Sequence, residues 1–238
     1  MMICLEDKSA LILHSGTLAE ILLIMKGLKV LFDDKENDYF SRIIGYERYK
    51  KAIEKADGDR EELRSIFWNV LADDYCWEFV DGEIILRGGM TFKASGAKQN
   101  LMFKLLDFVS ENNLGEILGG RCVCDFGENF FSPNIIYLDK EKSRAIKGST
   151  NRFPIPNLIV ECNDDSCEEQ NMGVKFEEYA KFGVEEYWMM NPNNETIEQY
   201  QQEKGVFDFV GLIKKKDVIE SKVLKGFKVF LEDIFNNN

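Results

Sequence analysis

Hydrophobic and polar positions repeat with two different periods along this chain, and the period changes near residue 70. Before that point, apolar residues recur every three or four positions, which is the spacing of one face of a helix. Helices are expected at 18–28, 38–56 and 60–70. Beyond it, short apolar runs separated by turn residues predict strands interspersed with further helices. We therefore expect an N-terminal helical region over residues 1–69 and an α/β domain over residues 70–238.

The second part begins with a hairpin. Residues 77–86 alternate around an Asp81-Gly82 pair, which is typical of a two-residue turn between antiparallel strands. Amphipathic spacing then predicts helices over 97–112 and 171–182, and the polar stretch 139–153 predicts a long loop. Strands are expected at 116–124, 134–138, 158–162, 186–190 and 196–200, with a final hairpin-like pair at 207–212 and 218–222.

Composition narrows the chemistry. The chain has 238 residues and a net charge of −12. This charge argues against broad, nonspecific binding of nucleic acid, because such binding neutralises phosphates with lysine and arginine. A local basic groove stays open, with candidates within 140–152 and at 214–216. The single histidine, His14, excludes zinc sites with several imidazoles and most serine or cysteine triads.

Cysteine spacing and hydropathy bear on the compartment. The six cysteines form no C-x-x-C pair and no disulfide-like spacing, so we expect reduced thiols in a cytoplasmic protein. The longest apolar window, 18–31, is interrupted by Glu20, Lys26 and Lys29. It is too short and too charged to span a bilayer, so no membrane partner is expected.

One carboxylate stands inside a strongly apolar run. Glu161 lies within residues 158–162, and a charged group in a buried strand is costly unless a metal ion or a cationic side chain pairs with it. Lys175 lies at the edge of the apolar stripe of the next predicted helix, so its ammonium could reach the strand that carries Glu161. The alternative is an exposed pair between Lys175 and Glu178, one turn along the helix. The pattern leaves both open.

Several motifs follow one another from residue 70 to the end of the chain. They are the strand hairpin over 77–83, Asn113-Leu114-Gly115-Glu116, the run 156–161, and the stretch 175–192 with its Glu186-Tyr187-Trp188. In this combination the chain resembles the Uma-type endonucleases of the PD-(D/E)XK restriction-endonuclease-like superfamily. The resemblance implies a mixed central sheet flanked by helices, and one magnesium-dependent site that cleaves phosphodiester bonds.

The site that the resemblance implies is altered at its acidic positions. Glu161 and Lys175 match the family pattern, and Glu78 matches as well. Asparagine stands where the family has aspartate, at Asn134, Asn157 and Asn171. An amide oxygen can bind a cation but carries no charge, so we expect Glu161 and Asn134 to hold magnesium weakly or not at all. Asn134 is the expected ion-sharing position, since Asn157 lies four residues from Glu161 along one strand, about 13 Å away.

Three functions follow from these residues. The first is a binding or regulatory module that acts on DNA and whose endonuclease-like metal site has degenerated. Whether such a protein is an enzyme stays open. The second is an active magnesium-dependent endonuclease that uses Glu161, Lys175 and asparagine or nearby aspartate ligands. The third is a protein-interaction scaffold whose N-terminal helices bind a partner or a second copy of the chain, as a homodimer. The acidic composition favours the third over the first.

Overall fold

The computed structural model describes residues 2–4, 10–12, 28–30, 59–68, 77–86, 90–120, 122–162 and 173–236. The chain divides into two compact units, Met1–Gly89 and Met90–Asn238. The predicted helix over 38–56, nearly all of that over 18–28, and Asn171 lie outside the described residues. The expected boundary near residue 70 stays a prediction.

The first unit contains a small sheet and, among its described residues, one helix. β4 (Trp77–Val80) and β5 (Glu83–Leu86) form the predicted antiparallel hairpin, and β3 (Leu28–Val30) pairs parallel with β5. The Asp81-Gly82 turn is confirmed, since both residues have positive φ angles, 51° and 86°. α4 (Arg60–Ile66) begins after Asp59, whose side chain accepts the Glu62 backbone N–H at 2.7 Å. β1 (Met2–Cys4) and β2 (Ala10–Ile12) form a separate antiparallel pair.

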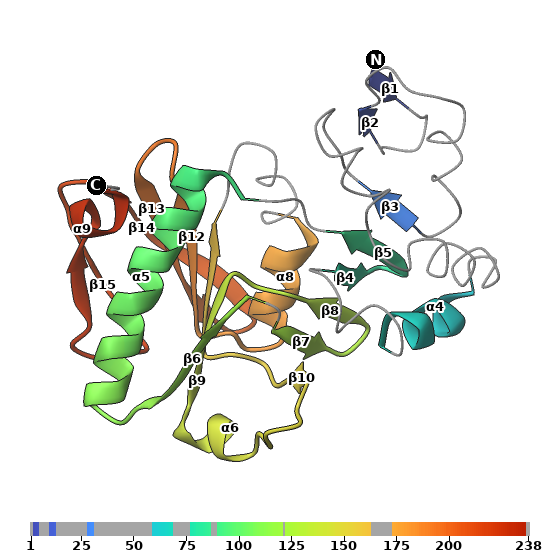
Figure 1. Ribbon diagram of the computed structural model, residues 1–238, viewed down its shortest axis with the longest axis horizontal. Helices are drawn as coiled ribbons and strands as arrows, with labels where there is room; N and C mark the ends of the chain where they lie inside the picture. Colours follow the sequence, from blue (N-terminus) through green and yellow to red (C-terminus); the bar gives the residue numbers. More distant parts are fainter. Residues whose placement is uncertain are drawn as a thin grey trace. The chain divides into compact units, whose positions relative to one another are not determined.

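A six-stranded mixed sheet forms the centre of the second unit (Figure 1). Its order is β14-β13-β12-β11-β9-β6, and neighbouring strands are antiparallel except for the parallel pair β11–β12. The bounds are β6 Gly115–Gly119, β9 Ile135–Asp139, β11 Leu158–Cys162, β12 Glu186–Asn191, β13 Thr196–Glu203 and β14 Val206–Lys214. All five residues of β11 are buried, as expected for a strand inside a sheet with both faces covered.

The two faces of this sheet carry different helices. α5 (Phe92–Glu111) covers one face, where its leucines pack in one apolar cluster with Leu158 and Val160 of β11. This helix begins earlier than predicted because Thr91 caps it, its hydroxyl accepting a backbone N–H of the first turn at 3.2 Å. α8 (Val174–Lys181) lies on the other face, where Tyr179 packs edge-on against Tyr187 of β12. The central sheet is therefore flanked by helices, as predicted.

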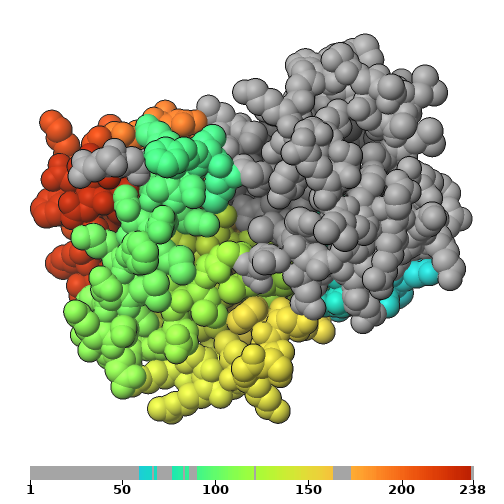
Figure 2. Space-filling model, in the orientation of Figure 1, coloured from blue at the N-terminus to red at the C-terminus, as the bar shows by residue number. Residues whose placement is uncertain are grey.

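The C-terminal segment packs against α5. β15 (Val218–Glu220) and β16 (Lys228–Phe230) pair with each other and lead into α9 (Leu231–Phe235). Asn100 of α5 donates to the Ile234 carbonyl at 2.9 Å, and Figure 2 shows the segment, in red, beside α5, in green. The expected pairing of 207–212 with 218–222 is wrong. β14 pairs instead with β13, because Lys204-Gly205 forms a two-residue turn between them.

Two further predictions are corrected. The single strand expected over 116–124 is interrupted after Gly119, so that β6 joins the central sheet while β7 (Val123–Phe126) pairs with β8 (Asn129–Phe131) and β10 (Arg152–Phe153). The break falls where Gly120 adopts a φ of 90°, a conformation that favours glycine. The polar stretch 139–153 also contains a short helix, α6 (Lys140–Arg144), capped by Asp139. None of the helices in the described ranges is both long and apolar enough to cross a bilayer.

Candidate functional site

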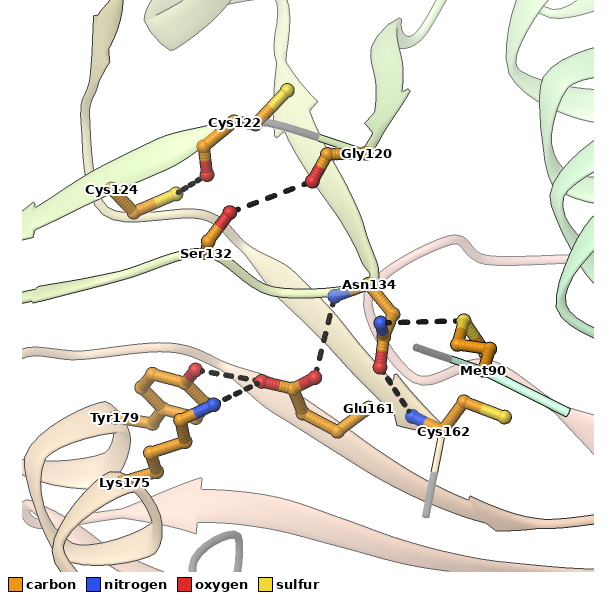
Figure 3. Close-up of polar contacts among 10 residues, drawn as sticks. All are labelled: Met90, Gly120, Cys122, Cys124, Ser132, Asn134, Glu161, Cys162, Lys175 and Tyr179. Carbon is orange, nitrogen blue, oxygen red and sulfur yellow. Dashed lines mark hydrogen bonds and ion pairs between the residues drawn. The ribbon is translucent and has the colours of Figure 1, made fainter. Parts of the chain in front are cut away.

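Glu161 stands in the buried strand β11, on the face that α8 covers (Figure 3). Side chains alternate along a strand, so Val160 and Cys162 join the core beside α5 while Glu161 points the other way. The Glu161 side chain is 0% exposed. An ionised carboxylate at this depth requires opposite charge and hydrogen bonds to offset its lost hydration.

α8 supplies two partners for this carboxylate. Lys175 and Tyr179 lie four positions apart, so both side chains leave the same face of the helix. The Lys175 Nζ lies 3.2 Å from Glu161 Oε1, and the Tyr179 hydroxyl donates to the same oxygen at 3.0 Å. The ammonium also lies 5.8 Å from the centre of the Phe131 ring. Lys175 is only 3% exposed, so the ion pair is removed from water.

The alternative pairing of Lys175 with Glu178 is wrong. Glu178 forms an ion pair with Lys181 at 2.8 Å, and Lys181 is exposed whereas Lys175 is buried. The helix therefore directs one lysine into the sheet and the other toward solvent. The sequence predicts Lys175 at the edge of the apolar stripe of this helix, and the structure buries the residue.

Asn134 completes the arrangement from a neighbouring strand. It immediately precedes β9, which pairs antiparallel with β11. Its backbone N–H donates to Glu161 Oε2 at 3.3 Å, and its side-chain Oδ1 accepts the Cys162 backbone N–H at 2.7 Å. The structure thus brings together three residues that the sequence singled out, Asn134, Glu161 and Lys175, from two strands and one helix (Figure 3).

Asn157 binds a different set of groups. It precedes β11, and its Nδ2 donates to Asp139 Oδ2 at 3.0 Å and to Glu185 Oε1 at 2.6 Å, while its Oδ1 accepts the Asp139 N–H at 3.0 Å. The backbone N–H of Lys142 and, after it, the Asn157 amide hold the pKa of Asp139 below its ordinary value of 3.8. Asn157 therefore links the end of β9 to the start of β11, which is a structural role.

Among the described residues, the oxygen atoms at and beside Glu161 already accept hydrogen bonds. Magnesium requires near-octahedral oxygen ligands that bring negative charge. Both oxygens of Glu161 accept hydrogen bonds, and Asn134 Oδ1 accepts a backbone N–H. No three carboxylate, imidazole or thiol groups of the described residues gather closely enough to hold a metal ion. Of the other family-matched residues, Glu78 is buried in β4 of the first unit and Asn171 lies outside the described residues. The nearby aspartates that follow β11, Asp164 and Asp165, also lie outside them.

Sequence reasoning missed Tyr179 as a member of this site. The residue is counted in the apolar stripe of the helix, and its ring is indeed fully buried against Phe126 and Phe131. Its hydroxyl, however, reaches Glu161. The available signal was its spacing of four residues from Lys175, which places both polar ends over the same point of the sheet.

Another buried carboxylate, Glu186, belongs to the Glu-Tyr-Trp motif. It begins β12 on the face opposite to Glu161, and it is 0% exposed. Its Oε1 accepts from Trp188 Nε1 at 2.7 Å and Gln199 Nε2 at 2.6 Å. Its Oε2 accepts from the Ser221 hydroxyl at 2.6 Å and from the backbone N–H groups of Lys222 and Val223 at 2.9 and 3.0 Å. The motif residue therefore holds the C-terminal segment to the central sheet.

The fold is that of a nuclease-like α/β protein of the restriction-endonuclease type. The Uma2 family model, described as "Putative restriction endonuclease", matches residues 61–232. This match covers more than half of the chain, and the protein belongs to the Uma2 family.

A solved structure shares the fold. It is described as a "putative nuclease belonging to DUF820 from Anabaena variabilis ATCC 29413". It is 15% identical to this chain, with a TM-score of 0.59, and the match covers 67% of this chain and 89% of that chain. At this identity the likeness concerns the fold alone, and it agrees with the predicted restriction-endonuclease-like architecture. A search among curated proteins found no match.

Proposed function

We propose that this protein is a nuclease-like module whose metal site has degenerated, and that it binds or regulates rather than cleaves. The observation that carries the proposal is that the buried Glu161 has a neutral amide, Asn134, beside it where the family pattern has an aspartate, and has its charge paired with Lys175 at 3.2 Å. Without a second carboxylate, the ammonium of Lys175 suffices to offset the charge of Glu161. Membership of the Uma2 family supports the nuclease-like part of the proposal.

Asn134 supports the same conclusion. An aspartate at this position would place a second negative charge beside Glu161, and such a pair attracts a divalent cation. The asparagine instead donates its backbone N–H to Glu161 and accepts the Cys162 N–H with its side chain. A neutral amide can therefore join β9 to β11 at this point without a counterion.

Duplex DNA is the partner that a nuclease-like fold suggests, and one basic segment suits it. α6 carries Lys140, Lys142 and Arg144 within a single short helix. Two other basic candidates, Arg152 and Lys215, form ion pairs with acidic side chains at 2.5 and 2.9 Å. We therefore place any contact with phosphates at α6, where the charge is local in an otherwise acidic chain.

The thiols support a reducing compartment, and we place the protein in the cytoplasm. Cys122 is a free thiol and is buried, and Cys124 and Cys162 are buried as well. Burial raises the pKa of Cys122 to about 11, so this thiol stays protonated and unreactive. Lysing intact cells directly into denaturant with a thiol-alkylating reagent checks the redox state of these cysteines.

Titration calorimetry with magnesium and manganese tests the function. The wild type is expected to give little or no binding, and Asn134→Asp is expected to bind either ion more tightly, because it restores a carboxylate beside Glu161. Asn194→Asp is the matched control, since it adds the same charge at an exposed turn. Asn157→Asp is unsuitable as a control, because Asp139 and Glu185 already flank that position.

The same proteins are then mixed with labelled duplex DNA. The wild type is expected to bind it, measured by anisotropy, without cutting it above background. If the wild type cut DNA with magnesium and Glu161→Ala abolished the cutting, the proposal of a degenerate site would be overturned in favour of an active endonuclease. A protein that neither binds nor cuts DNA would favour the interaction scaffold instead. Equal metal affinity of Asn134→Asp and the control would show that Asn134 is not the altered ligand.

A further inference from the structure

We propose that β14 is the contact surface of a homodimer, in which two copies of the chain pair their β14 strands antiparallel and extend the central sheet. β14 is the outermost strand of this sheet among the described residues (Figure 1). An edge strand presents a row of backbone donors and acceptors that can pair with another strand. This inference does not depend on the proposed function.

β14 lacks several of the features that protect an edge strand. Natural edges are short, charged, interrupted by proline or covered. β14 runs for nine residues without proline, and it exposes 58% of Phe209, 43% of Val210 and 46% of Leu212. Large apolar side chains that gather on an edge strand indicate a contact surface rather than a solvated one.

A β-bulge places Phe209 and Leu212 on the same face. Phe209 lies opposite Tyr200 and Leu212 opposite Glu198, so that Val210 is the extra residue of β14. Tyr200 and Glu198 are two positions apart on β13 and share a face, where the Tyr200 hydroxyl donates to the Glu198 carboxylate. Phe209 and Leu212 therefore lie side by side on that face.

An aromatic cluster of the core continues to this edge. Phe176 of α8 packs against Tyr200 and Phe207, with ring centres 5.0 and 5.1 Å apart. Phe209 is the next ring, 5.4 Å from Tyr200, and it is more than half exposed. α8 thus covers the inner part of the cluster and leaves the outer ring uncovered, which is the place where an apolar side chain from a second strand would pack.

The sequence of β14 is complementary to itself in the antiparallel direction. A two-fold axis between Val210 and Gly211 places Phe209 opposite Leu212 of the partner subunit, and symmetry makes this contact twice. Asp208 and Lys214 lie on opposite faces of the strand, since they stand opposite Gln201 and Thr196 of β13, and neither meets its own charge in this register. The two apolar contacts therefore favour a second copy, in this register.

Light scattering coupled to size-exclusion chromatography, and sedimentation equilibrium, test the full chain. The wild type is expected to be a dimer. Phe209→Glu and Leu212→Lys are each expected to raise the dimer dissociation constant on the order of 100-fold, because each removes two buried apolar contacts. Phe103→Glu is the matched control on α5, where the side chain is 55% exposed, and it is expected to leave the dimer unchanged.

Mixing the two single variants tests the register. One chain with Phe209→Glu and one with Leu212→Lys would form a heterodimer that keeps one wild-type contact and gains one pair of opposite charges. Circular dichroism of each variant checks that it is folded. A monomeric wild type, a dimer that both single variants leave intact, or a mixture that shows no heterodimer would each overturn the proposed pairing.

Discussion

Two donors share a single oxygen atom of Glu161. Its Oε1 accepts from both Lys175 and Tyr179, while its Oε2 accepts the backbone N–H of Asn134. Because these groups are buried, each loses hydration on folding, and the contacts offset that loss only as a set. Removing one member leaves the others buried without a partner. A single substitution in this cluster is therefore expected to lower the free energy of unfolding strongly, and a double substitution that removes both partners of a contact is expected to cost less than the sum of the two single ones.

Lys175→Met is expected to lower the free energy of unfolding by about 3–5 kcal/mol, because Glu161 would stay buried without its cation. Lys181→Met, which breaks the exposed pair with Glu178, is expected to cost less than about 1 kcal/mol. Urea unfolding measures both. The double variant Glu161→Gln/Lys175→Met is expected to recover part of the loss. If it were as unstable as the two single variants added together, the two residues would not be coupled.

At the scale of elements, one side chain joins the C-terminal segment to the sheet. Glu186 at the start of β12 accepts from Ser221 and from the backbone of the two residues that follow it. The segment continues through Phe227, which packs against Phe108 of α5 with ring centres 5.4 Å apart. Glu186 has no cationic partner among the described residues. Its buried charge is stabilised by five hydrogen bonds that its two oxygens accept, because hydrogen bonds to a charged oxygen are stronger than those between neutral groups.

Glu186→Gln is expected to lower the free energy of unfolding by about 2–4 kcal/mol, because its amide nitrogen would face donors that need an acceptor. Glu177→Gln, an exposed change on α8, is the control and should have little effect. Hydrogen exchange shows where in the chain the stability is lost. The backbone amides of Lys222 and Val223 should exchange faster in Glu186→Gln, while those of β11 should follow only the global stability. Unchanged exchange at both amides would contradict an anchoring role.

At the scale of the whole molecule, the first unit contributes strands as well as helices. β3 pairs parallel with β5, so residues before 59 complete a sheet whose other strands belong to the family-matched region. In the same unit, Leu63 and Phe67 of the α4 region are buried, and Phe67 contacts Phe79 of β4 with ring centres 6.1 Å apart. The N-terminal residues are thus expected to stabilise the family-matched region.

A chain that begins at Arg64 is expected to unfold at a lower temperature than the full chain. It lacks β3, which leaves an edge of β5 unpaired, and it lacks the Asp59 cap of α4. It also lacks the amphipathic stretches 18–28 and 38–56, whose apolar stripes need a partner. Thermal unfolding followed by circular dichroism measures the difference. Equal transition temperatures and equal solubility would show that these residues do not pack on the rest of the chain.

Local pattern was sufficient for elements whose geometry is decided within a few residues. Alternation and continuous apolarity predicted β11 with its observed bounds, and the Asp81-Gly82 pair predicted the first hairpin. The charged residue in that buried strand and the lysine one helix later predicted a buried pair as one of two alternatives. In each case, the relevant period or turn residue is present in the sequence itself.

Tertiary structure decided everything that depends on which strand lies beside which. The order of β9, β11 and β12 brings the Asn134 N–H to Glu161, and no local period encodes that order. The same reason explains the error at β15, whose partner β16 lies beyond a loop rather than across the preceding turn. The sequence by itself determined that Glu161 would need a buried partner, because the cost of burying its charge follows from its strand alone. Only the fold decided that Lys175, Tyr179 and a backbone N–H would meet that need together, because their convergence arises from long-range packing of β9 and α8 on β11.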